Sequence, residues 1–408
     1  MISKVKACVS VASRKACPPR ASGSGPLSRL RERVRERAGL ARGALLLLAL
    51  AGCSHRPPAA GPSAPIAVVA LPKVGVEARS EFNEGLRIMK MGRKHYKDAQ
   101  QHLQRATQID PKLFEAWHNL GVLLAALGEW DKAIDSFRKA LDVQPGSRTT
   151  VLAYGETLRR AHQAKDAAKL YAKWLESDPN DADMRARYGQ MLREAGELEE
   201  SLEQARILLG QGGQGEAAIG KTVIAYNALG LTYYKMGKLD LAETALRKAA
   251  ELDAKSAFVW NNLGLVAFDR GHDQEAFLHF QKASELDPKY VQARLNKAVV
   301  FMDCGDYKRA RAELERAVEI DPNDADAQVA LGVASRGEGK LDLARRAYER
   351  ALDIEPDYPP ALWNLAVLYM DYDKDKVKAK DYLTQFKQAA DNADPKRAEA
   401  DARLKELQ

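Results

Sequence analysis

The sequence predicts an all-α protein in which short helical hairpins repeat along the chain and stack into a solenoid. Prolines recur every 34 residues, at Pro111, Pro145 and Pro179 and again at Pro288, Pro322 and Pro356. A period of this length is typical of stacked helical hairpins. The chain is also rich in the helix formers Ala, Leu, Glu, Lys and Arg. Its apolar fraction of 46% is that of an ordinary globular protein.

The first element, residues 1–52, is predicted to be a signal peptide. It holds eleven Lys or Arg residues against two acidic residues, and it ends in the apolar run GALLLLALA at 43–51. A basic stretch followed by a short apolar core is the pattern of an export signal. The run is too short for a membrane-spanning helix. The basic part is unusually long, and we interpret the true start as lying downstream of Met1.

The second element, residues 53–77, is predicted to be a lipidated cysteine with a tether. Leu50, Ala51, Gly52 and Cys53 resemble the lipobox of bacterial lipoproteins, which implies that Cys53 is acylated and becomes the mature N-terminus. Two or more acyl chains anchor a protein stably to a membrane. Ser54 after the cysteine implies sorting to the outer membrane, with the body in the periplasm. The Pro/Ala/Gly-rich residues that follow predict an extended spacer.

Residues 78–209 are predicted to hold copies one to four of the repeat, and residues 223–390 copies five to nine. The copy at 114–147 places its large and small side chains at fixed positions, counted from its first residue. Position 4 is Trp117, position 7 Leu120, position 8 Gly121, position 15 Gly128, position 20 Ala133, position 24 Phe137, position 27 Ala140 and position 32 Pro145. Small residues at 8, 20 and 27 let two antiparallel helices approach, and the large residues fill the space between them.

This pattern resembles the tetratricopeptide repeat (TPR) family. The resemblance implies a right-handed superhelix of helix-turn-helix repeats whose first helices line a concave groove through positions 2, 5, 6, 9 and 12. The groove residues would be asparagines, which can pair with an extended peptide backbone, beside apolar side chains such as Val122. The predicted protein-binding residues are Asn119, Asn227, Leu231, Tyr234, Asn261, Asn262, Leu265, Phe268, Asn296, Val299 and Asn364. The alternative is that the apolar ones only pack between helices.

Residues 210–222 are predicted to be a Gly-rich linker, and a hinge between the two groups of repeats. The segment contains the spacing of a phosphate-binding loop, ending in Gly220, Lys221 and Thr222. That chemistry needs a buried strand before the loop, and the flanking pattern is helical.

His272, Glu275 and His279 have helical spacing, and we interpret them as a solvated face. The sequence therefore predicts no nucleotide, no metal, no other cofactor and no enzyme activity.

The last element, residues 391–408, is predicted to be a charged capping helix. Outside the leader the net charge is −2, so the sequence predicts no nucleic-acid partner. Lipobox, tether and repeats together resemble the TPR lipoprotein of the myxobacterial gliding-motility complex or, as a second choice, the pilotin lipoproteins of type IV pili. The resemblance implies an outer-membrane scaffold that binds protein components of an envelope machine. The alternative is a periplasmic chaperone-like holder of extended polypeptides.

Overall fold

The computed structural model describes residues 75–211, 216–391 and 394–407. Over these ranges the chain forms nineteen α-helices, one 3₁₀ helix and one π-helix, without any strand. The predicted all-α fold class is therefore confirmed. The predicted signal peptide, Cys53 and all but the end of the tether lie outside the described residues. None of the described helices is both long and apolar enough to cross a membrane.

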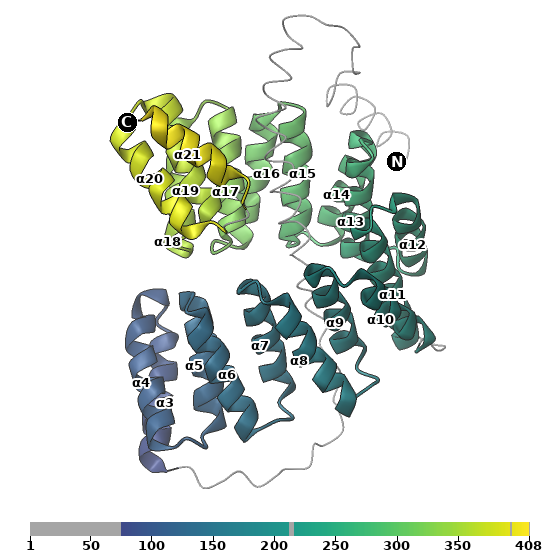
Figure 1. The fold of residues 1–408 in the computed structure, drawn as a ribbon. Helices are drawn as coiled ribbons and strands as arrows, with labels where there is room; N and C mark the ends of the chain where they lie inside the picture. Colours follow the sequence, from purple (N-terminus) through teal and green to yellow (C-terminus); the bar gives the residue numbers. More distant parts are fainter. Residues whose placement is uncertain (1–74, 212–215, 392–393, 408) are drawn as a thin grey trace, which may run out of the picture. The chain divides into compact units, whose positions relative to one another are not determined.

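The described helices form nine antiparallel hairpins in the order expected (Figure 1). The first helices are α3 (Val76–Met89), α5 (Phe114–Leu127), α7 (Arg148–Arg160), α9 (Ala182–Ala195), α11 (Glu216–Lys235), α13 (Ala257–Asp269), α15 (Val291–Asp303), α17 (Ala325–Gly337) and α19 (Pro359–Leu368). The second helices are α4 (Tyr96–Ile109), α6 (Trp130–Val143), α8 (Ala164–Ser177), α10 (Leu198–Gly210), α12 (Leu239–Leu252), α14 (Asp273–Leu286), α16 (Tyr307–Ile320), α18 (Leu341–Ile354) and α20 (Lys376–Ala389). Helix α21 (Lys396–Glu406) follows them.

In several hairpins the two helices approach most closely where a glycine at position 8 meets a large side chain at position 24. A Cβ atom placed on Gly264 would lie 2.5 Å from Cε1 of Phe280, and one on Gly121 would lie 2.8 Å from the Phe137 ring. Real Cβ atoms do not approach neighbours so closely, so only glycine lets the second helix pack here. These contacts place both residues in the register that the sequence predicts.

The turn between the two helices usually needs a left-handed residue at position 15. Glycine supplies it in most copies, for example Gly128 with φ 80° and Gly339 with φ 85°. The third copy has His162 at this position, with φ 58°. A side chain makes that conformation costly, so this turn is strained relative to the turns that have glycine.

The first and last copies absorb insertions that the 34-residue pattern does not anticipate. In the first copy a 3₁₀ helix, η1 (Arg93–His95), fills the turn. In the ninth, the π-helix η2 (Tyr369–Asp373) takes up one extra residue, and the left-handed turn residue becomes Lys374. The fully buried small residue of the second helix is consequently Ala379, one place later than the period predicts.

The first helices of several neighbouring hairpins contact one another, whereas successive second helices of the described chain do not do so to a similar extent. The chain divides at residues 253 and 254 into two compact units. In the first unit α5 contacts α7 and α9 contacts α11; in the second, α13, α15, α17 and α19 contact each other in turn. Each unit therefore presents a face made by first helices, which we call its first-helix face.

The predicted linker at 210–222 is wrong in its second half. Residues 216–222 begin α11, which has 20 residues, and only 212–215 of this segment lie outside the described ranges. Helix α11 packs on α10 and α9, and the hydroxyl oxygens of Ser201 and Thr232 lie 3.0 Å apart. Alanine and isoleucine after the glycines let the helix start early. The division of the chain accordingly falls after α12 rather than at the glycines.

Helix α21 packs on the ninth hairpin. Ala400 is fully buried in a cluster with Leu362 and Phe386. The guanidinium carbon of Arg403 lies 5.3 Å from the centroid of the Trp363 ring, and that ring is buried. The helix thus covers apolar surface that the last hairpin would otherwise expose.

Candidate functional site

In the first unit the predicted binding residues differ in how exposed their side chains are. Asn119 is half-buried, and its amide donates to the carbonyl of Glu115 in the preceding turn at 2.8 Å. Asn227 is half-buried, whereas Leu231 and Tyr234 are buried. Val122 on α5 is the exposed apolar residue of this group, with 36% of its surface accessible.

In the second unit the structure brings three predicted asparagines together. Asn296 on α15 donates to Oδ1 of Asn261 on α13 at 2.8 Å, and Asn261 donates to Oδ1 of Asn262 at 3.4 Å. All three side chains are buried. Asparagines from successive first helices therefore share one face as expected, and part of their hydrogen-bonding capacity is used between the helices.

The other predicted residues of this unit do not belong to the asparagine cluster. Leu265 and Phe268 are buried on α13, and Val299 is half-buried on α15. Asn364 on α19 donates to the carbonyl of Pro360 at 2.8 Å, as Asn119 does within its own helix. That these residues contact a partner stays a prediction.

His118, at position 5 of the second copy, joins neighbouring first helices. Its Nδ1 lies 2.9 Å from Oγ1 of Thr150, which belongs to α7. Burial lowers the pKa of His118, because the charged ring would lose its hydration. The first-helix face therefore carries a neutral imidazole here at neutral pH.

The sequence pattern did not predict a hydrogen bond that joins successive copies. The side chain at position 4 donates to the carbonyl of the residue that closes the preceding copy. Trp117 Nε1 reaches the oxygen of Pro111 at 2.9 Å, and Arg294 Nη2 reaches that of Pro288 at 2.9 Å. Trp260 does the same to Ala254. The recurrence of an N–H donor at position 4 was the available signal.

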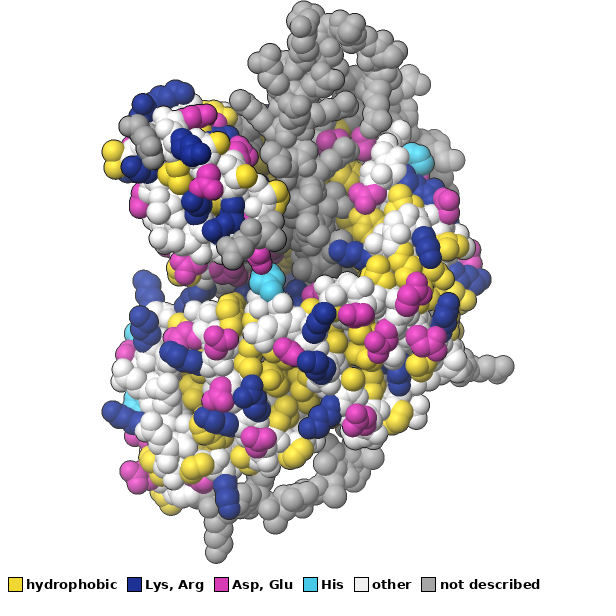
Figure 2. Space-filling model, viewed as in Figure 1, with side chains coloured by type: hydrophobic (Ala, Val, Ile, Leu, Met, Phe, Trp, Pro, Cys, Tyr) yellow, Lys and Arg dark blue, Asp and Glu magenta, His cyan; other side chains and the backbone are white. Residues whose placement is uncertain are grey.

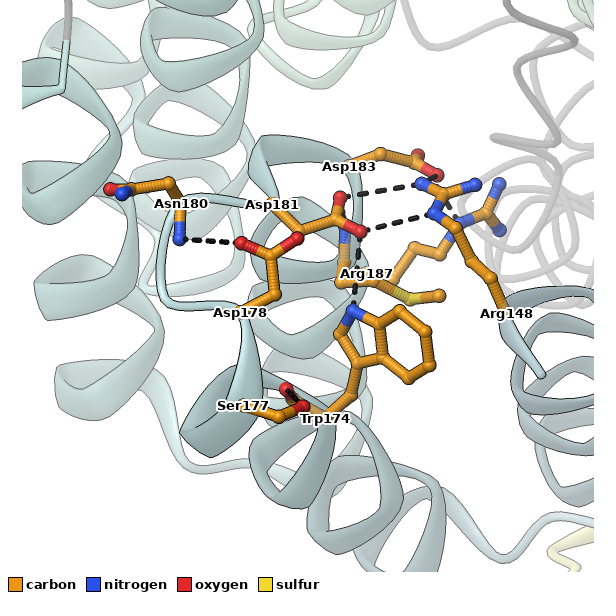
Figure 3. Close-up of polar contacts among 9 residues, drawn as sticks. Arg148, Trp174, Ser177, Asp178, Asn180, Asp181, Asp183 and Arg187 are labelled. Atoms are coloured by element: carbon orange, nitrogen blue, oxygen red, sulfur yellow. Dashed lines mark hydrogen bonds and ion pairs between the residues drawn. The ribbon is translucent and has the colours of Figure 1, made fainter. Parts of the chain in front are cut away.

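A polar cluster ties the third copy to the fourth (Figure 3). Arg148 at the start of α7 donates from Nε to Asp181 Oδ2 at 3.0 Å and from Nη2 to Asp183 Oδ2 at 2.8 Å. Trp174 Nε1 donates to the same Asp181 oxygen at 3.2 Å. Burial alone would raise the pKa of Asp181, but the hydrogen bonds from Arg148 and from the backbone of Met184 outweigh it and lower the pKa.

The possible metal-binding residues and the possible phosphate-binding loop of the sequence both lie in or next to helices. Glu275 lies 3.6 Å from His272 and 3.5 Å from His279, and the His279 ring packs 5.4 Å from the centroid of Trp260. Within the described ranges no three His, Cys, Asp or Glu side chains are grouped as metal ligands. Gly220, Lys221 and Thr222 lie inside α11, so they do not form a phosphate-binding loop.

Comparison with protein families identifies the repeat. Models described as "Tetratricopeptide repeat" match residues 114–147, 152–216, 221–289 and 267–332, and one described as "TPR repeat" matches 336–371. Together they cover more than half of the chain. The chain belongs to the tetratricopeptide repeat family. As a TPR protein it carries its repeats on both sides of the glycine-rich segment.

Individual relatives of this TPR protein are distant. A TPR repeat-containing protein of Dictyostelium discoideum is 25% identical over 121 residues, which are 28% of this chain and 46% of that protein. The match thus spans about half the length of the relative. A chain of the APC/C hetero-tetramer Cut9-Hcn1 is 15% identical, with a TM-score of 0.48 over 81% of this chain and 64% of its own. Yeast Tom70 is 12% identical, with a TM-score of 0.43 over 81% of this chain and 95% of its own.

Proposed function

We propose that this TPR protein is anchored to the outer membrane through a lipid on Cys53 and holds protein components of an envelope machine together in the periplasm. TPR proteins bind protein partners, so a role as an interaction scaffold follows from the family. The observation that carries the proposal is the face formed by first helices, through contacts of α5 with α7 and of α9 with α11 in the first unit and along α13, α15, α17 and α19 in the second. The anchor is supported by the lipobox that ends at Cys53.

The sequence resembles the gliding-motility TPR lipoprotein and, as a second choice, the type IV pilus pilotins. This resemblance supports a role in such an envelope machine. Charges of both signs are interspersed over the described surface seen in Figure 2. A mixed surface suits selective contacts with several proteins better than attraction to one strongly charged polymer. The alternative of a holder for extended polypeptides predicts many unrelated clients instead of one assembly.

The test of the partner face compares two matched substitutions. Val122→Glu places a charge on first helix α5, and Leu278→Glu does so on second helix α14, at side chains that are 36% and 42% exposed. We expect both proteins to fold and only Val122→Glu to lose partners in a pull-down of the mature chain from envelope extract, quantified by mass spectrometry.

Recovery of one motility or secretin subcomplex by the unsubstituted chain supports the scaffold. Recovery of many unfolded clients would replace it with the holder function. Equal recovery by both variants would show that the partners do not use the first-helix face at α5.

The anchor is tested separately by Cys53→Ser. We expect this variant to lose metabolic labelling with a palmitate analogue and to move from the membrane fraction to the soluble periplasmic fraction. Continued labelling, or continued sedimentation with outer membranes, would contradict lipidation at Cys53.

A further inference from the structure

The turn that joins α3 to α4 carries an excess of positive charge. Residues 90–97 contain no Asp or Glu. All four of their cationic side chains are exposed: Lys90, Arg93, Lys94 and Lys97. None of the ion pairs among the described residues involves the three lysines. The turn, which we call the basic turn, therefore presents its charge to the solvent.

An exposed apolar side chain lies within the basic turn. Met91 is 57% exposed. The backbone fixes its position, because the N–H of Met91 donates to the carbonyl of Ile88 at 3.0 Å and that of Gly92 to the carbonyl of Met89 at 3.1 Å. Gly92, with φ 105°, then leads the chain into the 3₁₀ helix η1. The turn thus holds one apolar side chain in water beside several cations.

The corresponding turn of the fourth copy has the opposite charge. Residues 194–200 contain four Glu residues and no Lys or Arg. Neighbouring groups already compensate part of that charge, because Lys165 Nζ lies 3.8 Å from Glu197 Oε1 and the Gln190 amide donates to Glu194 Oε1 at 2.9 Å. A second copy of the chain would therefore offer the basic turn a partly neutralised surface. This observation favours another kind of partner.

We propose that the basic turn docks on a membrane surface that contains anionic phospholipids, with Met91 entering the headgroup layer. Each Lys or Arg close to such a surface is attracted by its negative potential, and the apolar side chain gains by leaving water. A nucleic acid would attract the same cations through its phosphates, but it gives the exposed methionine no comparable gain. The presence of a membrane near the turn rests on the lipid anchor proposed above.

The length of chain between Cys53 and the first hairpin permits this contact. Residues 54–74 separate Cys53 from Gly75, and a coil of that many residues has ends about 25 Å apart. Helix α3 has 14 residues, so the basic turn lies about 21 Å from Val76. A tether of this length can therefore bring the turn to the membrane that holds Cys53. It also raises the effective concentration of the turn at that surface, so a weak contact suffices.

The test measures how much of the mature chain floats with lipid vesicles at low ionic strength. The chain carries Cys53→Ser, so that no acyl group contributes to binding. One set of vesicles is phosphatidylcholine alone, and the other is phosphatidylcholine mixed two to one with phosphatidylglycerol.

Three variants of this chain are compared. Lys90→Gln with Lys94→Gln removes two charges of the basic turn, and Met91→Ser removes its apolar side chain. Lys112→Gln with Lys173→Gln is the matched control, because both lysines are exposed and lie in the same unit outside the turn. All the substituted side chains are exposed, so we expect each variant to fold, and thermal melting followed by circular dichroism checks this.

We expect binding only to the vesicles that contain phosphatidylglycerol. The paired substitution in the turn should weaken it about fivefold for each lysine removed, whereas the paired control should change it less than about twofold, because those charges do not face the lipid. Met91→Ser should weaken it roughly threefold. Physiological salt screens the attraction, so the turn alone does not keep the unlipidated chain on membranes.

Equal binding to both kinds of vesicle, or equal loss in the two paired variants, would overturn the proposal. Tighter binding to a DNA duplex, unaffected by Met91→Ser, would assign a nucleic acid to the turn instead. Dimers at low ionic strength that the paired turn substitution abolishes would assign a second copy. Palmitate labelling of the chain that keeps Cys53 is measured separately, so failure of the lipid contact and failure of the anchor are distinguished.

Discussion

Gly264 shows how one residue fixes the approach of two helices. A leucine there would have to share the space that the Phe280 ring occupies, 2.5 Å from the Cβ position. We expect Gly264→Leu to lower the free energy of unfolding by roughly 1–3 kcal/mol or more through overpacking, measured by urea denaturation. Gly146→Leu is the control, because a Cβ at Gly146 meets nothing within 4 Å. Equal stability of the two variants would contradict the repeat register.

His162 is the residue at which a stabilising change is expected. It holds the left-handed turn position, with φ 58°, which glycine holds in most other copies. His162→Gly should raise the melting temperature, with a gain of up to about 1 kcal/mol, because glycine adopts this conformation without the steric cost of a side chain. His162→Ala keeps the cost and serves as the comparison. A variant with glycine that melts below the one with alanine would disprove strain at this turn.

His118 makes stability depend on pH. Its pKa is lowered in the folded state by burial, so the unfolded chain binds a proton more readily. The contribution of the neutral His118 ring to the free energy of unfolding is therefore complete above the pKa of histidine in the unfolded chain, about 6.5. It is lost as the pH falls toward the lower pKa of His118 in the folded state. We expect the free energy of unfolding to drop between pH 7.5 and 5.5, and to drop less in His118→Gln. The exposed His95→Gln should follow the unsubstituted chain.

At the scale of elements, neighbouring hairpins are joined by polar contacts as well as by apolar packing. Asp181 illustrates this, because it caps α9 through the backbone N–H of Met184 and also accepts from Arg148 and Trp174. The arginine is 43% exposed, so solvent weakens its part of the ion pair. The cap and the buried acceptor remain the larger contributions.

Asp181→Ala is expected to destabilise the first unit by about 1–3 kcal/mol, from the lost cap and the unpaired indole N–H. The pKa of Asp181 is lowered in the folded state, so its contribution is complete above the unfolded pKa of about 3.9 and is lost as the pH falls below that value. Chemical denaturation at pH 7 and at pH 3 measures this. Asp178→Ala, which removes only an exposed acceptor for Asn180 N–H, is the control. A similar loss in both variants would refute the joint role of Asp181.

At the scale of the whole molecule, a stack of hairpins stays in solution only if its end hairpins have a polar outer surface. Helix α21 has one fully buried side chain, Ala400, which lies against the cluster of the last hairpin. Ala400→Glu should detach the helix, because a carboxylate cannot be buried there without a partner. We expect faster tryptic cleavage after Lys396 and a shift of Trp363 emission to longer wavelength, compared with a variant at the exposed Glu406. Unchanged proteolysis and emission would show that the cap is held by other contacts.

The hairpins could be predicted from the sequence because the residue pattern that defines each one is local. Proline, glycine and the large side chains recur in one period, and each such residue has its role within one hairpin. The sequence pattern did not predict the early start of α11, because the glycines of this segment were given more weight than the helix-forming residues that follow them. It also did not predict the π-helix of the ninth copy, because the extra residue there departs from the 34-residue period. The candidate site was predicted by position alone, and position did not reveal that Asn296 would bond to Asn261.

The amino-acid sequence alone establishes the helical repeat, its register and the pairing of glycine with an aromatic ring in four hairpins, at Gly121, Gly155, Gly264 and Gly332. These follow from the size and backbone preferences of residues that are near one another in the chain. The folded structure was needed to show where the chain divides into units and which asparagines are buried together. Those properties arise between hairpins, where side chains from different copies compete for the same space and the same hydrogen bonds.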